Sequence, residues 1–238
     1  MRGDVRFRNV GAMTDRPLAL ITGASRGIGA AVAAALADTH DLLLGGRDEA
    51  ALSTVASTLP GARPWPVELG DEAAVRAAVA DIDRLDVLVH SAGIARLGAL
   101  ADVSAADWRD SFEINVVAVA ELTRLLLPAL RAASGHVVLV NSGSGIKANP
   151  LWGPYSASKF ALRAYADVLR AEEPTLRVTS VHPGRTATDM QRAVRSFEGG
   201  DFEPAKYMTP ESVAGMIHAA ITTPPDAHVH ELVIRQRQ

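Results

Sequence analysis

Residues 18–29 read LALITGASRGIG, and this stretch decides the fold. The apolar run Leu18–Thr22 predicts a buried strand, and a helix is expected over Gly29–Ala37. The turn between them contains the glycines Gly23, Gly27 and Gly29. Glycine permits a tight turn, close backbone approach to a ligand and close packing of helix on strand. Because the start of a helix presents free N–H groups that favour phosphate, the stretch predicts a dinucleotide-binding turn. It lacks the GxxxxGK[ST] spacing of an ATP-hydrolysing P-loop.

Outward from this stretch, short apolar runs alternate with helical segments. Besides Leu18–Thr22, the expected strands are Asp41–Leu44, Arg63–Val67, Leu85–Val89, His136–Asn141, Leu176–Val181 and Glu231–Ile234. The expected helices include Glu49–Thr58, Ala73–Ile82 and Ser156–Arg170. This alternation predicts right-handed crossovers and an α/β fold, a Rossmann-type doubly wound parallel sheet of about seven strands flanked by helices. We expect a single domain over residues 17–238, preceded by a disordered leader at residues 1–16.

The segment Ser104–Arg131 is expected to form one long helix. Ser104 and Asp107 resemble a capping box at its start. Asn115 is unusual inside a helix because its amide competes for backbone hydrogen bonds, and it is interpreted either as a solvent-facing residue or as a functional one. Pro128 is expected to kink or end the helix.

Composition limits the kind of protein. The chain has 238 residues, 48% hydrophobic and 21% charged, which is an ordinary globular balance. A net charge of −3 without a clustered basic face argues against a nucleic-acid partner. No apolar run is long enough to span a membrane, so we expect no membrane partner. The absence of cysteine excludes disulfides and thiolate metal sites and fits a cytoplasmic location, and we expect no bound metal.

The end of the second strand indicates which dinucleotide is bound. An acidic residue there hydrogen-bonds the ribose 2′-hydroxyl of NAD, whereas an arginine accommodates the 2′-phosphate of NADP. Here Gly46 occupies the acidic position, Arg47 follows it, and Arg26 lies in the glycine turn. Guanidinium donors suit a phosphate dianion, so the sequence favours NADP(H) over NAD(H). Asp48 is expected to point elsewhere, as the cap of the next helix.

Tyr155 and Lys159 lie four residues apart and therefore share a helix face. A tyrosine has a pKa near 10 and is a poor base at neutral pH. The nearby ammonium is expected to lower the pKa of the phenol toward the working range. The pair alone is weak evidence, because Tyr-x-x-x-Lys arises by chance in many helices. Ser142, thirteen positions before Tyr155, ends a buried strand and is a potential hydrogen-bond donor to a substrate oxygen.

Together these features resemble the classical short-chain dehydrogenase/reductase (SDR) family. The resemblance covers residues 17–234 and rests on the GxxxGxG turn, the YSASK motif and the serine thirteen positions before its tyrosine. It implies four catalytic residues, with Tyr155 as acid/base, Lys159 orienting the cofactor ribose, Ser142 holding the substrate oxygen, and Asn115 of the EINV stretch holding a water in a proton relay.

The resemblance also implies a set of cofactor-binding residues from several loops. Besides the three glycines, the two arginines, Tyr155 and Lys159, they are Ser25, Ile28, Glu68, Leu69, Ser91, Ala92, Gly93, Pro183, Gly184, Thr186 and Thr188. Glu68 and His90 depart from the residues that the family usually has, and their effect on adenosine binding stays open. His90 is interpreted as structural. Arg185 is expected to reach either the diphosphate or an acidic substrate.

The implied function is an NADP(H)-dependent oxidoreductase that moves a hydride between the nicotinamide and a carbonyl or secondary alcohol carbon. The alternative is a catalytically silent NADP-binding sensor, which predicts a damaged tyrosine or lysine, and both are intact. A serine hydrolase is rejected because the residues around Ser142 do not form a G-x-S-x-G elbow. The identity of the substrate and the direction of the reaction stay open.

The substrate is expected to contact Leu97, Leu151, Trp152 and a mobile lid over Met190–Tyr207. This apolar lining indicates an apolar or aromatic carbonyl compound as the small-molecule substrate. Members of the SDR family commonly assemble through helices that correspond to Ser104–Arg131 and Ser156–Arg170, so a homotetramer or homodimer is expected.

Overall fold

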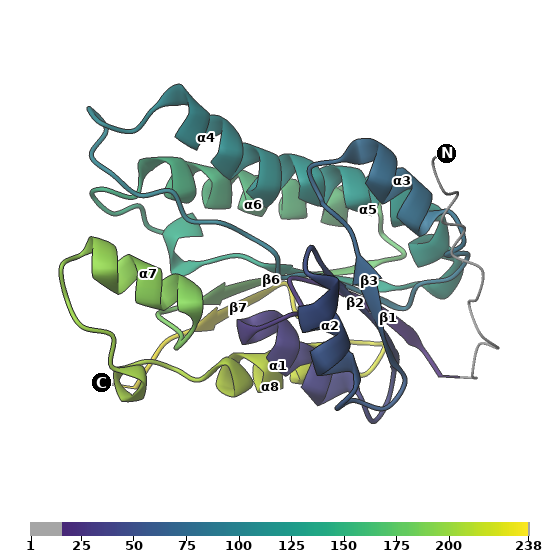
Figure 1. Cartoon of the computed structure of the whole chain (residues 1–238). Coiled ribbons are helices and arrows are strands. Elements are labelled where there is room, and N and C mark those ends of the chain that lie inside the picture. The colour runs from purple at the N-terminus through teal and green to yellow at the C-terminus, as the bar shows by residue number, and fades with distance from the viewer. Residues whose placement is uncertain (1–15, 238) are drawn as a thin grey trace, which may run out of the picture.

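A parallel sheet runs through the centre of the molecule, with its strands in the order β3-β2-β1-β4-β5-β6-β7 (Figure 1). The structure is a computed structural model that describes residues 16–237. Its strands are β1 (Leu18–Thr22), β2 (Asp41–Gly46), β3 (Ala62–Pro66), β4 (Val87–His90), β5 (His136–Val140), β6 (Arg177–Pro183) and β7 (Glu231–Ile234). Each strand lies within two residues of its predicted bounds, and the Rossmann-type doubly wound α/β fold is confirmed.

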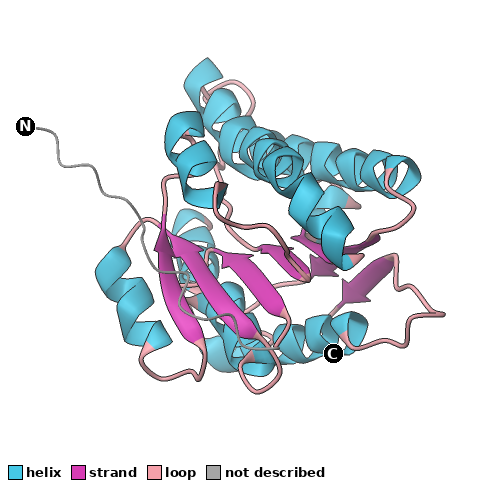
Figure 2. Ribbon diagram, turned by 90° about the vertical axis from the view of Figure 1, so that its right-hand side faces the viewer, coloured by secondary structure: helices cyan, strands magenta, loops and turns pink. Residues whose placement is uncertain are grey.

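Helices cover both faces of the sheet (Figures 1 and 2). One face carries α1 (Gly27–Leu36), α2 (Glu49–Ala56) and α8 (Pro210–Ile221). The other carries α3 (Glu72–Val79), α4 (Ala105–Phe112), α5 (Ala118–Ala133) and α6 (Gly153–Glu172). The remaining helix, α7 (Asp189–Phe197), follows β6 and therefore begins at the edge of the sheet where the parallel strands end.

Two hydrophobic clusters hold these layers together. Successive side chains of a strand point to opposite faces, so Leu20 of β1 belongs to the cluster beneath α3, α5 and α6, and Ile21 belongs to the cluster beneath α1, α2 and α8. Both side chains are fully buried. Burial of one such side chain contributes roughly 1.5–3 kcal/mol, so these alternating contacts fix the register of the strand.

The segment predicted as one long helix is interrupted in the middle. The capping box of Ser104 and Asp107 starts α4 as expected, but residues 113–117 form a π-helix, Glu113–Val117, between α4 and α5. The extra residue in this turn brings the Asn115 side chain to the buried face, where its amide finds partners outside the helix, so the solvent-facing interpretation is wrong. Pro128 does not end α5, which continues to Ala133, since buried leucines on both sides of the proline hold the helix on the sheet.

The start of the domain includes one residue of the predicted leader. Residues 1–15 of that leader lie outside the described part of the chain. Arg16 donates hydrogen bonds to the carbonyl oxygens of Ala37 and His40 and lies 3.9 Å from the carboxylate of Asp41. Arg16 therefore packs against the domain. None of the helices within residues 16–237 has the length and apolar composition that crossing a membrane requires.

The order of the strands defines where a ligand binds. The chain builds outward from β1 to β2 and β3, then returns to place β4 on the other side of β1. Loops leaving β1 and β4 consequently diverge to opposite faces, and ligands of doubly wound sheets bind in the crevice at the carboxyl ends of these strands.

Candidate active site

A cleft of about 1320 Å³ opens at the carboxyl ends of the strands. It is lined by the turns after β1, β2, β4, β5 and β6 and by α7. Of the predicted catalytic residues, Ser142, Tyr155 and Lys159 line it. The predicted cofactor residues that line it are Gly23, Ser25, Arg26, Gly27, Ile28, Arg47, Glu68, Leu69, Ser91, Ala92, Gly93, Pro183, Gly184, Thr186 and Thr188. Gly29 and Asn115 lie behind the wall of the cleft rather than in it.

The glycine turn leaves the start of α1 open to the cleft. Gly23 and Gly27 have φ angles of 67° and 58°, the left-handed region that glycine adopts without strain. A Cβ atom at Gly23 would lie 2.8 Å from the backbone nitrogen of Ala92, so the turns after β1 and β4 touch here. The residue before α1, Arg26, provides no side-chain cap, whereas side chains cap α2, α3, α4, α7 and α8. The first N–H groups of α1 therefore fit a phosphate.

Two arginines lie at the rim beside this turn. Their side chains are 73% and 76% exposed, and each makes a loose ion pair, Arg26 with Asp189 at 3.4 Å and Arg47 with Glu68 at 3.6 Å. Exposed pairs of this kind contribute about 0–1 kcal/mol, so a phosphate competes for these guanidinium groups at little cost. Asp48 caps α2 by accepting a hydrogen bond from the Ala51 N–H at 3.0 Å, as predicted.

The turn after β4 is held by a residue that the sequence analysis did not single out. The hydroxyl of Thr22 accepts hydrogen bonds from the N–H groups of Ser91 and Ala92, at 3.1 and 3.2 Å. The position of Thr22 at the end of β1 could have indicated this contact, because the neighbouring strand β4 ends at the same edge of the sheet. His90 is structural, as expected: it is buried, its Nε2 lies 2.9 Å from the hydroxyl of Thr123, and burial lowers its pKa to about 3.

Tyr155, Ser142 and Lys159 converge at the middle of the cleft. The Tyr155 ring is buried, and its phenol shares a hydrogen bond with the side chain of Ser142. The Lys159 ammonium lies 5.9 Å from the centre of the Tyr155 ring and donates a hydrogen bond to the Val140 carbonyl at 3.0 Å. The two side chains of the YSASK motif therefore share one helix face, and they meet a serine from the loop that follows β5.

The protonation states differ from the sequence prediction. Burial raises the pKa of the Tyr155 phenol, and the hydrogen bond with Ser142 only partly opposes this. Burial also lowers the pKa of Lys159 to about 8. The expected lowering of the Tyr155 pKa is therefore wrong, because removal from water is the largest effect on the phenol and the lysine is directed at the Val140 carbonyl.

Asn115 supports the catalytic residues from behind the wall. Its carbonyl oxygen accepts from the Ile94 N–H at 2.9 Å, and its NH₂ group donates to the Ile94 carbonyl and the Ser158 hydroxyl at 2.9 and 3.0 Å. The Ser158 hydroxyl in turn donates to the carbonyl of Tyr155 at 2.7 Å. The side chain of Asn115 thus ties the loop after β4 to the helix that carries the tyrosine.

Comparison with known proteins identifies the family. The sequence model described as short chain dehydrogenase matches residues 17–199, which contain the glycine turn and all of the predicted catalytic side chains. The chain belongs to the short chain dehydrogenase family.

Relatives of known sequence agree with this assignment. An uncharacterised short-chain type dehydrogenase/reductase of Sinorhizobium fredii is 33% identical, over 91% of this chain and 90% of its own length. The dehydrogenase/reductase SDR family member 11 of Mus musculus is 29% identical, over 92% and 93%. The glycine betaine reductase ATRR of Emericella nidulans is 33% identical over 99% of this chain, which spans only 20% of that larger protein.

Solved structures share the fold over almost the whole chain. An alcohol dehydrogenase of the archaeon Thermococcus sibiricus, complexed with 5-hydroxy-NADP, superposes with a TM-score of 0.85 at 26% identity, covering 94% of this chain and 99% of its own. A variant of actinorhodin polyketide ketoreductase with NADPH superposes with a TM-score of 0.84 at 26% identity, covering 94% and 97%.

In this short chain dehydrogenase the turn after β6 lines the cleft next to the glycine turn. The Thr188 hydroxyl accepts from the Gln191 N–H at 3.2 Å and caps α7, and its methyl group lies beside Gly27. Arg185 does not face the cleft as a free charge, because it forms an ion pair with Glu198. The expectation that Arg185 reaches the diphosphate or an acidic substrate is therefore not supported by its geometry in this structure.

The apolar wall of the short chain dehydrogenase cleft includes most of the predicted substrate contacts. Leu97, Trp152, Met190 and Phe197 line the cleft. Leu151 does not line the cleft. Its backbone has a φ angle of 69°, and its side chain is 47% exposed. The segment predicted as a lid begins with α7 and ends where Phe202 stacks on Tyr207, with ring centres 5.6 Å apart. Movement of this segment stays a prediction.

Two further residues of the dehydrogenase site were missed from the sequence. Asn141 accepts a hydrogen bond from the Ser142 N–H at 2.8 Å and donates to the Lys159 carbonyl at 3.0 Å, so it joins the serine loop to the catalytic helix. Arg235, immediately after β7, lines the cleft. The predicted parallel sheet could have indicated Arg235, because the carboxyl ends of all parallel strands lie at the edge of the sheet where ligands bind.

Proposed function

We propose that the protein is an NADP(H)-dependent oxidoreductase that transfers a hydride between the nicotinamide and a carbonyl or secondary alcohol carbon. The observation that carries this proposal is the convergence of Ser142, Tyr155 and Lys159 in one cleft with the uncapped start of α1. Two solved relatives of this fold are complexes with 5-hydroxy-NADP and NADPH, which supports a nicotinamide cofactor in the same cleft.

In the proposed reduction, Tyr155 gives a proton to the carbonyl oxygen. Because burial raises the pKa of this phenol, Tyr155 stays protonated at neutral pH and is ready to act as the acid. Ser142 donates a hydrogen bond to the same oxygen and stabilises the charge that develops there. A bound NADPH supplies the hydride.

Lys159 and Asn115 have supporting roles in this proposal. Lys159 holds the cofactor ribose through hydrogen bonds from its ammonium and resupplies the proton to the tyrosine. With a pKa of about 8, Lys159 exchanges a proton more readily near neutral pH than an exposed lysine does. Asn115 keeps the loop after β4 against α6, and the water that the family resemblance places beside it completes the relay to solvent.

The preference for NADP(H) over NAD(H) rests on the rim of the cleft. Arg26 and Arg47 lie beside the glycine turn, and no acidic side chain occupies the end of β2, where Gly46 stands. A 2′-phosphate would accept hydrogen bonds from these guanidinium groups in place of their loose ion pairs with Asp189 and Glu68.

The test is NADPH oxidation with a broad panel of aldehydes and ketones. Tyr155→Phe is expected to lower kcat by about 100- to 10,000-fold, the range of general acid catalysis, while NADPH binding measured by calorimetry persists. Tyr165→Phe is the matched control, because Tyr165 lies on the same helix, its phenol is mostly buried and it does not line the cleft. Binding of NADPH without turnover of any compound by the wild type would instead favour the sensor.

We further propose a homotetramer or homodimer in a reducing cytoplasm. Val117, Phe160 and Val168 are large apolar side chains at 45%, 42% and 52% exposure. They lie on the π-helix and on α6, within the segments that the family resemblance assigns to assembly. Light scattering coupled to size-exclusion chromatography measures the mass. A Phe160→Asp variant is expected to dissociate the oligomer, and a wild-type mass of one chain would contradict this part of the proposal.

A further inference from the structure

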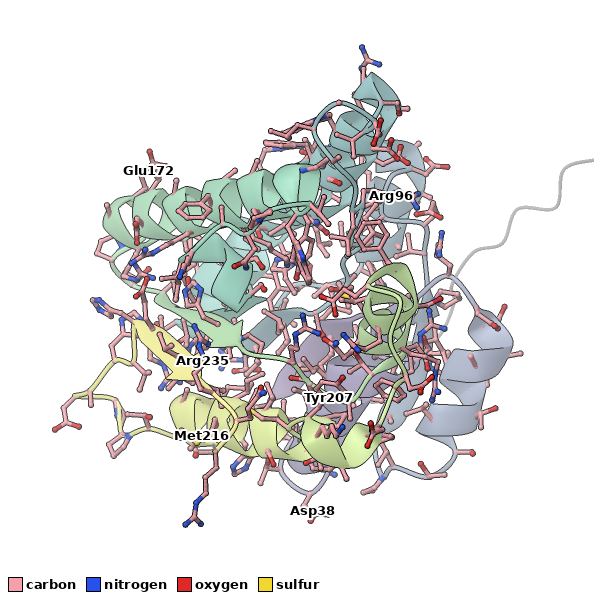
Figure 3. The ribbon with its side chains drawn as sticks, turned by 90° about the vertical axis from the view of Figure 1, so that its left-hand side faces the viewer. Asp38, Arg96, Glu172, Tyr207, Met216 and Arg235 are labelled. Atoms are coloured by element: carbon pink, nitrogen blue, oxygen red, sulfur yellow. The ribbon has the colours of Figure 1, made fainter. Side chains whose placement is uncertain are left out.

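The substrate end of the cleft holds a guanidinium that the proposed reaction does not use. Arg235 leaves the end of β7, as Figure 3 shows, and lines the cleft. Its Nη2 atom lies 3.3 Å from the point where a Cβ atom of Gly143 would stand, which places the guanidinium over the residue next to Ser142. A side chain at Gly143 would fill this space, so the glycine makes room for the arginine.

Backbone contacts hold the Arg235 guanidinium in this position. Its Nη1 atom donates to the carbonyl of His182 at 2.7 Å and to the carbonyl of Ile234 at 2.9 Å. Both hydrogens of Nη1 are therefore used, while Nε and Nη2 have no acceptor among the described residues. A planar group fixed by two carbonyls loses little further conformational entropy when it binds a ligand.

Most other charged groups of the cleft are already paired. The ion pairs are Arg26–Asp189, Arg47–Glu68, Arg96–Asp110 and Arg185–Glu198. Asp107 accepts hydrogen bonds from Ser104 at the start of α4. Within residues 16–237 no carboxylate forms an ion pair with Arg235, nor with Lys147, which also lines the cleft. The neighbourhood of Ser142 thus has an excess of positive charge.

We propose that Arg235 binds a carboxylate of the substrate, so that the enzyme prefers aldehyde or ketone acids over their neutral counterparts. This specificity rests on the proposed hydride transfer. The free Nε and Nη2 edge of the guanidinium matches the two oxygens of a carboxylate. Leu97, Trp152 and Phe197 line the same cleft and provide apolar contacts for the body of such a substrate. Arg235 is thereby a specificity-determining residue. It binds the acidic group of the substrate, which was one of the two contacts expected for Arg185.

The experiment measures NADPH-dependent reduction of aldehyde acids and of their methyl esters. The acids include an aliphatic compound, succinic semialdehyde, and an aromatic one, para-carboxybenzaldehyde. The readout is the ratio of kcat/KM for the acid to kcat/KM for its ester, because this ratio cancels effects on folding or cofactor binding. The wild type is expected to favour the acid. Arg235→Gln is expected to lower the ratio by about 10- to 100-fold, mainly through the KM of the acid, since a charged hydrogen-bonding partner is lost.

Two control variants sharpen this result. Arg237→Gln removes an exposed charge two residues further on, and the acid-to-ester ratio is expected to stay within about twofold of the wild type. Arg235→Lys keeps the charge without the planar fork and is expected to give an intermediate ratio. A wild type that reduces acids and esters equally well, or a ratio that Arg235→Gln leaves unchanged, overturns the carboxylate site and leaves the proposed oxidoreductase intact.

A binding measurement separates this proposal from the proposed function. If the wild type turns over no compound, the oxidoreductase proposal fails, and titration of benzoate into the NADPH-loaded protein still tests Arg235. Benzoate binding that weakens at least about tenfold in Arg235→Gln but not in Arg237→Gln supports the carboxylate site. Absent or equal binding in all three proteins overturns it.

Discussion

The two ends of the cleft present different kinds of groups. At the glycine turn, the first backbone N–H groups of α1 and two arginines border the cleft, and the arginine side chains are 73% and 76% exposed. Around Tyr155 and Lys159, side chains are buried, and burial shifts the pKa values of both groups. One end presents charged groups at the surface, and the other removes two titratable groups from water. The comparison shows that the same fold keeps charged groups in water at one end of the cleft and buries titratable groups at the other.

Burial at the catalytic end has a cost in stability that the glycine end does not have. Lys159 loses its hydration, which favours its neutral form and lowers its pKa from 10.5 to about 8. The rim arginines keep most of their hydration and contribute little to folding. Substitutions at the two ends should therefore change activity and stability in different combinations, and the following variants test this contrast.

The largest effect is expected for Lys159→Met. Activity should fall by about 100- to 10,000-fold because the ammonium beside Tyr155 is lost, while the free energy of unfolding at pH 7 should rise by about 1–3 kcal/mol because no charge is buried. In the wild type, stability should increase as the pH rises from about 8 to 10.5, since only the unfolded state binds the lysine proton in that window. The variant should lack this increase.

Denaturant unfolding at several pH values measures the effect of Lys159→Met. Lys206→Met is a suitable control, because Lys206 is an exposed lysine paired with Glu203, and its loss should change stability by less than about 0.5 kcal/mol. A destabilised Lys159→Met with unchanged pH dependence would show that the ammonium is not desolvated in the folded protein.

The next effect concerns the glycine end. Gly23→Ala should lower the free energy of unfolding by about 2–4 kcal/mol and weaken NADPH binding, because the new Cβ atom would lie 2.8 Å from the Ala92 nitrogen at a φ angle of 67°. Gly199→Ala is the matched control, with a φ angle of 70° and no atom within 4 Å, and should cost about 1 kcal/mol. Equal losses in the two variants would mean that the close approach of the two turns does not matter.

The smallest effect is expected at the rim. Arg47→Gln should raise the KM for NADPH about tenfold and leave the KM for NADH within about twofold, because only NADPH carries the 2′-phosphate. Thermal unfolding should be unchanged, as it should be for the control Arg76→Gln, another exposed arginine in an ion pair. If the KM for NADPH and the KM for NADH rise by the same factor, Arg47 does not determine the preference for NADPH.

The sequence by itself determined the fold and predicted which side chains meet in the cleft. Strand periodicity, the glycine spacing and the four-residue separation of Tyr155 and Lys159 are local features, since each follows from the geometry of one helix or strand. They placed every strand within two residues and predicted that Ser142 meets the tyrosine. The resemblance to a known family rested on these same local motifs.

Only the tertiary structure decided the environment of those residues. Sequence spacing does not reveal how much water reaches a side chain, so the raised pKa of Tyr155 was not predicted. The π-helix at Asn115 was not predicted either, because it depends on how the helix packs on the rest of the chain. Contacts between distant segments were equally inaccessible: Glu198 neutralises Arg185, and the end of β7 brings Arg235 over Gly143. Solvation and long-range pairing depend on how the whole chain packs, and this is why the charge pattern of the cleft required the folded molecule.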